Sequence, residues 1–218
     1  MTTTTTTATT PRTTTPTTTT TLTITAGGAS RIGADRTKIR PWWRWVATAL
    51  VFPPAGYLAH WLIGRVDAIT PAVLAGAVTG AFVGVAQWSL LRRRGVSAMW
   101  IVATAVGFAA GLATGAALVD YGTSLPALAA MGAVCGGAIG LAQAAGTVAL
   151  RRHAAAWTVA SAALWAIGWA VTTAFGIDVE QQYAVFGISG ALVVAFGQGV
   201  VLNRLIPATP AHEVIDHA

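Results

Sequence analysis

The sequence predicts an all-α membrane protein, in which six transmembrane helices form three parallel two-helix repeats that close into a pseudo-threefold bundle. Two observations support this. Hydrophobic residues make up 55% of the 218 positions and charged residues only 9%, whereas about a quarter of an average soluble domain is charged. In addition, a stripe of small residues that ends in a glutamine occurs three times, with a period of 55 to 56 residues.

The net charge of +6 and the pI near 10.7 also occur in nucleic-acid-binding proteins. Here, however, the basic residues flank apolar runs, where they are typical determinants of membrane topology. We therefore expect the lipid bilayer as a partner and no nucleic acid. The single cysteine, Cys135, lies within an apolar run and cannot form an intrachain disulfide.

The N-terminal region has the composition of a disordered tail. Residues 1 to 25 contain 18 threonines, a low-complexity pattern that cannot bury a core. Such a tail is either a target for phosphorylation or O-glycosylation, or an unconstrained or misassigned start. A basic segment and tryptophans at 42, 43 and 45 follow, as is typical before a span. We expect a cytoplasmic tail over residues 1–40, a transmembrane domain over 41–205 and a short cytoplasmic tail over 206–218.

The first predicted span, Val46 to Ile63, contains an expected helix break at Pro53 and Pro54. Two prolines remove two backbone donors and cost about 3 kcal/mol or more if nothing compensates. Broken helices at membrane depth pack within protein or line a wet cavity. A secretory signal also places a basic region before an apolar run, but this run begins some 45 residues into the chain, so we favour an uncleaved span.

Five further apolar runs have about the ~20 residues needed to cross ~30 Å of hydrocarbon. They are Ala72 to Leu91, Ala98 to Val119, Ala127 to Leu150, Ala155 to Phe175 and Ala184 to Leu202. Of the 13 basic residues, only Arg65 lies on the side opposite the N-terminus, and the acidic residues Asp67, Asp120, Asp178 and Glu180 lie there too. The positive-inside rule therefore predicts that both termini are cytoplasmic.

The three repeats are clearest in the even-numbered spans, which read GAVTGAFVGVAQ (76–87), GAVCGGAIGLAQ (132–143) and GISGALVVAFGQ (187–198). Small residues four apart share one stripe of a helix and let two backbones approach closely in lipid. The helix-packing residues expected from this glycine zipper are Gly76, Gly80, Gly84, Gly132, Gly136, Gly140 and Gly187. The odd-numbered spans align through ATA, ATA and ASA, led by Trp45, Trp100 and Trp157. Because each unit has two spans, all copies share one orientation, and a closed ring leaves no small-residue face unpaired.

The alignment also predicts one polar layer in the cytoplasmic half of the bundle. Gln87 precedes Arg92 by five residues, which places it about 7.5 Å inside the boundary at 1.5 Å per residue. The predicted pairs are Gln87 with Thr104, Gln143 with Ser161 and, across the ring closure, Gln198 with Thr48. Two interpretations stay open. The layer is either a polar constriction or binding site for a small solute, or a set of interhelical bonds worth ~0.6 and at most ~1.7 kcal/mol each.

Other polar residues give weaker signals. His60 is the single histidine in a predicted span, so an interfacial side chain is favoured over a proton relay or a metal or haem ligand. His212 and His217 lie in a proline-containing tail without a fixed metal-binding scaffold. The loop acids Asp67, Asp120 and Asp178 either form a ring that attracts cations or are simply solvated. We expect no metal and no cofactor.

The group of proteins that this chain resembles consists of bacterial multi-pass membrane proteins with a repeated GxxxGxxQWxxLRRR element followed by WxxATxxG. The match is clearest over Gly80 to Arg94 and Trp100 to Gly107. In the later copies Ala144 and Gly199 stand at the tryptophan position, and only Arg204 remains of the third basic cluster. The resemblance covers roughly residues 42 to 205. It implies an architecture in a bacterial cytoplasmic membrane, and no chemistry.

Signatures of catalysis are missing from the sequence, which has no HExxH, GxSxG or Walker motif and no acidic pair within a predicted span. Charge is also missing from the span centres, which argues against an energised transporter. The sequence favours a non-enzymatic protein that acts by association in the membrane, with itself or with another membrane protein. The alternative is a passive channel or facilitator for a small solute through the layer of glutamine and threonine.

Overall fold

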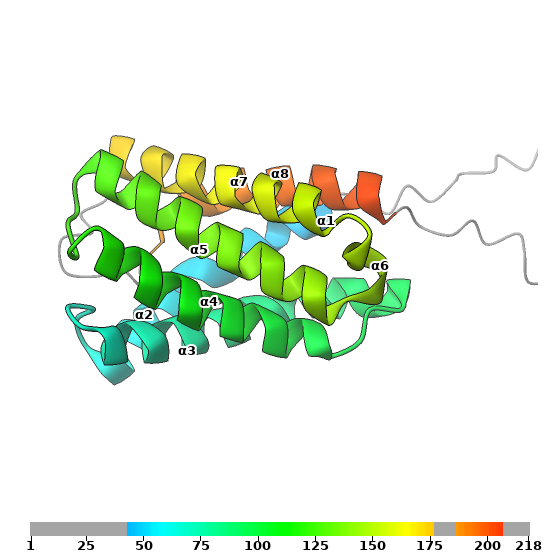
Figure 1. Cartoon of the computed structure of the whole chain (residues 1–218), viewed down its shortest axis with the longest axis horizontal. Helices are drawn as coiled ribbons and strands as arrows, with labels where there is room; N and C mark the ends of the chain where they lie inside the picture. The colour runs from blue at the N-terminus through cyan, green and yellow to red at the C-terminus, as the bar shows by residue number, and fades with distance from the viewer. Residues whose placement is uncertain (1–42, 177–185, 207–218) are drawn as a thin grey trace, which may run out of the picture. The chain divides into compact units, whose positions relative to one another are not determined.

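The computed structural model describes residues 43–176 and 186–206 (Figure 1). Within these ranges six helices are long and apolar enough to cross a membrane. The chain is therefore an all-α, multi-pass membrane protein, as the sequence predicts. The threonine-rich tail, the C-terminal tail and the loop with Asp178 and Glu180 lie outside the described residues.

The first span changes helix type where the sequence predicts a break. It consists of α1 (Trp43–Val46), the 3₁₀ helix η1 (Ala47–Val51) and α2 (Phe52–Ile63). Pro53 and Pro54 lie in the first turn of α2, where a missing N–H removes no bond within the helix. The Phe52 N–H bonds to the Ala49 carbonyl, three residues back, as in a 3₁₀ turn. The prolines are thus accommodated in a helical span that begins at Trp43, three residues before the predicted start.

The remaining spans follow the predicted runs closely. They are α3 (Ile69–Leu91), extended by the 3₁₀ turn η2 (Arg92–Arg94), then α4 (Met99–Leu118), α5 (Leu125–Gly146), α7 (Ala154–Ala174) and α8 (Ile188–Leu205). The fourth span ends four residues before the predicted Leu150. Thr147 is extended, at φ −125° and ψ 110°, and α6 (Val148–Arg151) is a separate turn. Glycine at position 146 and a β-branched residue after it both weaken a helix end, which explains the difference.

The described spans form a closed ring. Each span packs against the next one along the chain, in the order α2, α3, α4, α5, α7 and α8. The ring closes where α8 contacts α1 and η1 of the first span. Figure 1 shows α3, α4, α5 and α7 side by side, with the first span behind them. Residues from distant parts of the sequence therefore meet inside one bundle.

Short connections place most described arginines at one end of this bundle. Arg44 precedes η1, Arg92–Arg94 follow α3, Arg151 and Arg152 lie between α5 and α7, and Arg204 lies in the last turn of α8. Among the described arginines only Arg65 lies at the other end, together with the described acids Asp67 and Asp120. We call the arginine-rich end the basic end.

Candidate functional site

The three glutamines of the predicted polar layer lie together inside the ring, each at most 3% exposed. Gln143 Nε2 donates to Gln87 Oε1 at 3.4 Å, and Gln87 Nε2 donates to Gln198 Oε1 at 3.5 Å. These distances exceed the usual 2.7–3.2 Å, so the amide–amide bonds are weak. They nevertheless link α5, α3 and α8, three helices that are far apart in the sequence.

Two buried tryptophans supply shorter bonds to the same layer. Trp100 Nε1 donates to Gln87 Oε1 and Trp157 Nε1 donates to Gln143 Oε1, both at 3.1 Å. Both tryptophans are 0% exposed. The repeat pattern predicts Trp100 and Trp157 only as the first residues of odd-numbered spans and does not predict their bonds to the glutamines. A signal was available, because each follows a repeat glutamine at nearly the same spacing, 13 and 14 residues.

The third repeat departs from this pattern at the ring closure. Trp45 leads the first span, and the pattern would pair its indole with Gln198. Instead Trp45 Nε1 is buried without a hydrogen-bond partner among the described residues, and Gln198 Oε1 accepts from Gln87. Trp45 packs on Gly199, where an added Cβ would lie 2.8 Å from the indole Cδ1. The contact of α8 with the first span therefore lacks the indole–glutamine bond that Trp100 and Trp157 make elsewhere in the ring.

The hydroxyl partners predicted for the glutamines are wrong. The structure does not join Gln87 to Thr104, Gln143 to Ser161 or Gln198 to Thr48; Thr104 Oγ1 accepts from Gln143 Nε2 at 3.0 Å. Thr104 and Thr48 donate instead to the carbonyls of Trp100 and Trp45, both at 2.7 Å. A helical hydroxyl readily bonds the carbonyl three or four residues back, and this local bond displaces the predicted one.

Ser161, the last member of the predicted layer, is 0% exposed, and its Oγ is buried without a hydrogen-bond partner in the described part of the chain. All six predicted residues are thus buried. Four of them, namely the glutamines and Thr104, form the connected network. The network with its two tryptophans is called the glutamine layer below.

Aromatic rings fill the interior next to the glutamine layer. In each odd-numbered span an aromatic residue lies four residues, or about 6 Å along the helix axis, after the hydroxyl residue. The pairs are Thr48 and Phe52, Thr104 and Phe108, and Ser161 and Trp165. Their ring centroids are 6.4 Å apart for Phe52 and Phe108, 5.6 Å for Phe52 and Trp165, and 5.0 Å for Phe108 and Trp165. Phe186 stacks on Trp165 at 5.0 Å. Three non-adjacent spans therefore meet through their rings at this level.

The glycine stripes of α3 and α5 lie against the backbone of the next span. A Cβ added at Gly76 would lie 2.6 Å from the Phe108 carbonyl oxygen, and one at Gly136 would lie 2.5 Å from that of Ser161. The other stripe members give added Cβ atoms within 3.0 Å of a neighbouring helix: Gly80, Gly84, Gly132 and Gly140. Only glycine permits this approach of α3 to α4 and of α5 to α7.

Gly187, the first small residue of the third stripe, is buried. It is the N-cap residue of α8, with extended backbone at φ −62° and ψ 153°. In the third copy the close approach occurs one turn later, where Gly190 meets Gly168 and Thr172 of α7.

The remaining candidates stay separate from one another. His60 is partly buried near the end of α2, and its Nδ1 has no hydrogen-bond partner among the described residues. Asp67 and Asp120 are exposed in loops, whereas Asp178, His212 and His217 lie outside the described residues. Over 43–176 and 186–206, no group of three or more His, Cys, Asp or Glu side chains is placed to hold a metal ion.

Comparisons of the chain with protein-family models, with curated proteins and with solved structures found no match. The geometry of the bundle itself is therefore the basis for its function. Its main features are the enclosed glutamine layer, the aromatic rings beside it and the helices held close by glycine.

Proposed function

We propose that this chain is a non-enzymatic protein of the bacterial cytoplasmic membrane that acts by association within the bilayer, with a second copy or with another membrane protein. In this proposal the glutamine layer holds the bundle together and conducts no solute. The observation on which the proposal rests is that the three glutamines are bonded to protein and at most 3% exposed.

The interior geometry supports a closed scaffold and argues against a path that conducts a solute. A polar constriction requires side chains that face a passing solute, yet the Gln87 and Gln143 oxygens accept indole N–H groups. One turn further along, Phe52, Phe108 and Trp165 contact each other across the interior. A solute that crossed the glutamine layer along the axis would meet these rings next.

Corresponding positions support the proposed pseudo-threefold arrangement of three parallel hairpins. A small hydroxyl residue is followed four positions later by a large aromatic one in each odd-numbered span, as Thr48–Phe52, Thr104–Phe108 and Ser161–Trp165. Each even-numbered span contributes one glutamine to the layer. The repeats would then place equivalent residues at equivalent depths around one axis along the membrane normal.

The outer surface supports association in lipid. Large apolar side chains such as Val85, Val106 and Val159 are 50%, 57% and 68% exposed and lie on three different helices. In a membrane these faces contact lipid or another protein without cost. The concentration of arginines at the basic end supports a cytoplasmic position for that end and for both termini.

The test replaces all three glutamines, as Gln87→Leu, Gln143→Leu and Gln198→Leu. The change removes five hydrogen bonds, which at ~0.6 kcal/mol each amount to ~3 kcal/mol. We expect a lower melting temperature in detergent and no flux of small neutral solutes into liposomes with either form. A matched control, Val85→Leu with Val106→Leu and Val159→Leu, changes three outward positions and should leave the melting temperature unchanged.

A stable triple variant that abolishes solute flux seen with the wild type would overturn the proposal in favour of a channel. Association is tested separately with two copies that carry different tags, expressed together and purified in mild detergent. Retention of the second copy supports self-association. Recovery of the chain alone, together with solute flux, would contradict the proposed function.

A further inference from the structure

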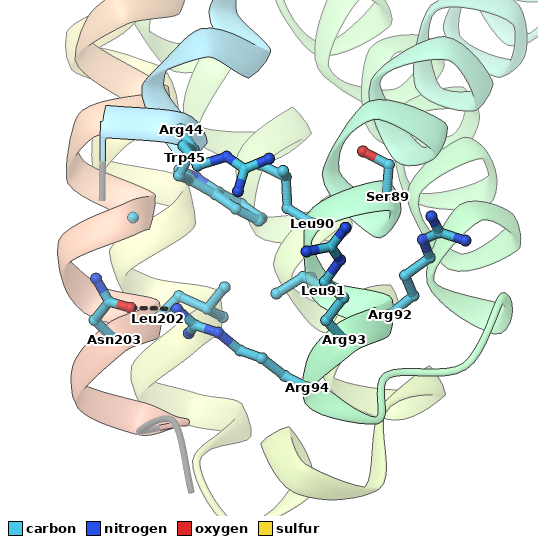
Figure 2. A pocket seen from close by; sticks show the side chains of 11 residues that line it. Arg44, Trp45, Ser89, Leu90, Leu91, Arg92, Arg93, Arg94, Leu202 and Asn203 are labelled. Carbon is cyan, nitrogen blue, oxygen red and sulfur yellow. Dashed lines mark hydrogen bonds between the residues drawn. The ribbon is translucent and has the colours of Figure 1, made fainter. Parts of the chain in front are cut away.

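A cavity of about 250 Å³ lies at the basic end of the bundle, at the ring closure. On the same measure a single water needs only ~15 Å³, so the cavity has room for a polar group of many atoms. Its lining comes from four elements: Arg44 and Trp45 of α1, Ser89 to Leu91 of α3, Arg92–Arg94 of η2, and Gly199, Leu202 and Asn203 of α8. Figure 2 shows these elements facing one another around it.

The sequence explains why the cavity lies here. The residue after the repeat glutamine is Trp88 in the first copy and Gly199 in the third. Glycine contributes no side chain to the space between α8 and α3, and it lets Trp45 pack directly on the α8 backbone. The ring closure is therefore open towards the membrane surface at the level of the arginines.

Four arginines line the cavity, and they are held in different ways. Arg94 is fixed across the closure, since its guanidinium donates to Asn203 Oδ1 at 2.8 Å and to the Ile206 carbonyl at 3.3 Å. Arg92 lies 5.9 Å from the centroid of the Trp88 ring. Figure 2 shows Arg44 and Arg93 reaching into the space between the first span and α3, while Arg92 turns away.

Like charges are concentrated here, and within 43–176 and 186–206 no acidic residue lies at this end of the bundle. The two acids of the described ranges, Asp67 and Asp120, lie at the opposite end of the bundle. Converging guanidinium groups repel each other, and this repulsion is relieved when an anion binds between them. The cavity is thus complementary in charge to a compact anion at the membrane surface.

We propose that this cavity is a binding site for a phosphate group, with Arg44 and Arg93 as its main ligands and Arg94 as a positioning residue. Arginine presents a planar fork of donors that matches two phosphate oxygens at once. Basic pockets between transmembrane helices on the cytoplasmic side bind anionic lipid headgroups. The same phosphate chemistry is also offered by free phosphate in the cytoplasm, and the experiment distinguishes these two sources.

The experiment titrates the full chain in neutral detergent with phosphatidylglycerol and counts bound lipids by native mass spectrometry. The test variant is Arg44→Gln with Arg93→Gln. The matched control is Arg151→Gln with Arg152→Gln, which removes two exposed charges from the same end outside the cavity. Since a hydrogen bond to a charged group contributes a factor of about ten or more, we expect at least tenfold weaker binding in the test variant and less than twofold change in the control.

Inorganic phosphate is then added at millimolar concentration. Lipid that stays bound identifies the headgroup as the ligand, whereas lipid that is displaced identifies free phosphate; both outcomes support the site. Equal binding by the two double variants, or no retained lipid and no phosphate binding by the wild type, would overturn the proposal. If the test variant melts early, Arg93→Gln is compared with Arg93→Lys, and the lysine variant should bind more tightly than the glutamine variant because it keeps the positive charge, although it lacks the planar fork; equal binding by these two variants would overturn the proposal.

Discussion

The packing of α5 on α7 predicts that alanine affects stability differently at two neighbouring glycines. Gly136 and Gly137 are adjacent in one helix, so a change to alanine has the same intrinsic effect on helix formation at both. A Cβ at Gly136 would lie 2.5 Å from the Ser161 carbonyl oxygen and 2.6 Å from Trp165 Cβ. At Gly137 the nearest such atom is Ala162 Cβ, at 3.8 Å, which is an ordinary contact.

The expected magnitudes follow from these distances. Non-bonded carbon atoms prefer about 3.5–4.0 Å, so Gly136→Ala must separate α5 and α7 by about 1 Å at this level. Neither obstacle can rotate away, because one is backbone and the other is the first side-chain atom. Overpacking of this kind lowers the free energy of unfolding by about 1–3 kcal/mol, whereas the higher helix propensity of alanine than of glycine raises it by up to about 1 kcal/mol. We expect Gly136→Ala to lower the free energy of unfolding by about 1–2 kcal/mol and Gly137→Ala to leave it unchanged or raise it slightly.

The assay is reversible unfolding in mixed micelles with increasing SDS, with helicity and tryptophan fluorescence as readouts. Gly136→Leu extends the series and should be more damaging than the alanine variant, because a longer side chain needs a wider separation. Equal stability of Gly136→Ala and Gly137→Ala would refute the packing of these two helices, since nothing else distinguishes the two positions so strongly.

Three further predictions concern the layer, the closure and the topology. Gln143→Leu should destabilise the protein more than Gln198→Leu, because Gln143 takes part in three side-chain hydrogen bonds and Gln198 in one; melting temperatures in detergent that reverse this order would contradict the network. Arg94→Ala should lower stability by no more than about 1 kcal/mol, as is usual for an interaction near the surface, and should speed hydrogen exchange in α8 selectively; exchange that rises equally in all helices would contradict its role at the closure. With Cys135 replaced by alanine, an impermeant thiol reagent applied to intact cells should label Asp67→Cys and miss Arg152→Cys, and the reverse pattern would invert the proposed orientation.

The sequence predicts the spans well because each is marked by composition alone. Charges, prolines and loops delimit the apolar runs, and α3, α4 and α7 begin and end within three residues of the prediction. The burial of Gln87, Gln143 and Gln198 was also predictable, because a polar amide on the glycine face of a helix must turn towards a neighbour. Periodicity determines which face is buried, and that information is local.

The partners within the layer were not predictable from that local pattern. Whether Gln87 meets Thr104 or Trp100 depends on how α3 and α4 are rotated and staggered, and both residues lie on the same face of α4. In the structure Gln87 accepts a hydrogen bond from the Trp100 indole, and Thr104 accepts one from Gln143. Rotation and stagger are set by the glycine contacts on both sides of each helix, so they follow from the whole ring.

The sequence does not predict the arginine-lined cavity, for a related reason. Arg44, Arg92, Arg93 and Arg94 all appeared in the sequence as topology determinants. Their convergence depends on the contact of α8 with the first span, which joins residues more than 150 positions apart. In the sequence, Gly199 is only a departure from the repeat. It leaves a space between helices because the closed ring brings α8 next to α3 and the first span.

Closure of the ring is the claim on which the enclosed layer and the proposed function both depend. A Cβ at Gly199 would lie 3.4 Å from Trp45 Cβ, close to the separation of about 3.5–4.5 Å found in disulfides. The measurement introduces Trp45→Cys and Gly199→Cys, with Cys135→Ala and a protease site between α4 and α5, and oxidises the protein in native membranes. The account predicts that the two fragments stay linked after cleavage until a reductant is added, whereas Trp45→Cys with Gly137→Cys does not link them. Fragments that separate without reductant, although both cysteines react with a thiol reagent after denaturation, would contradict it.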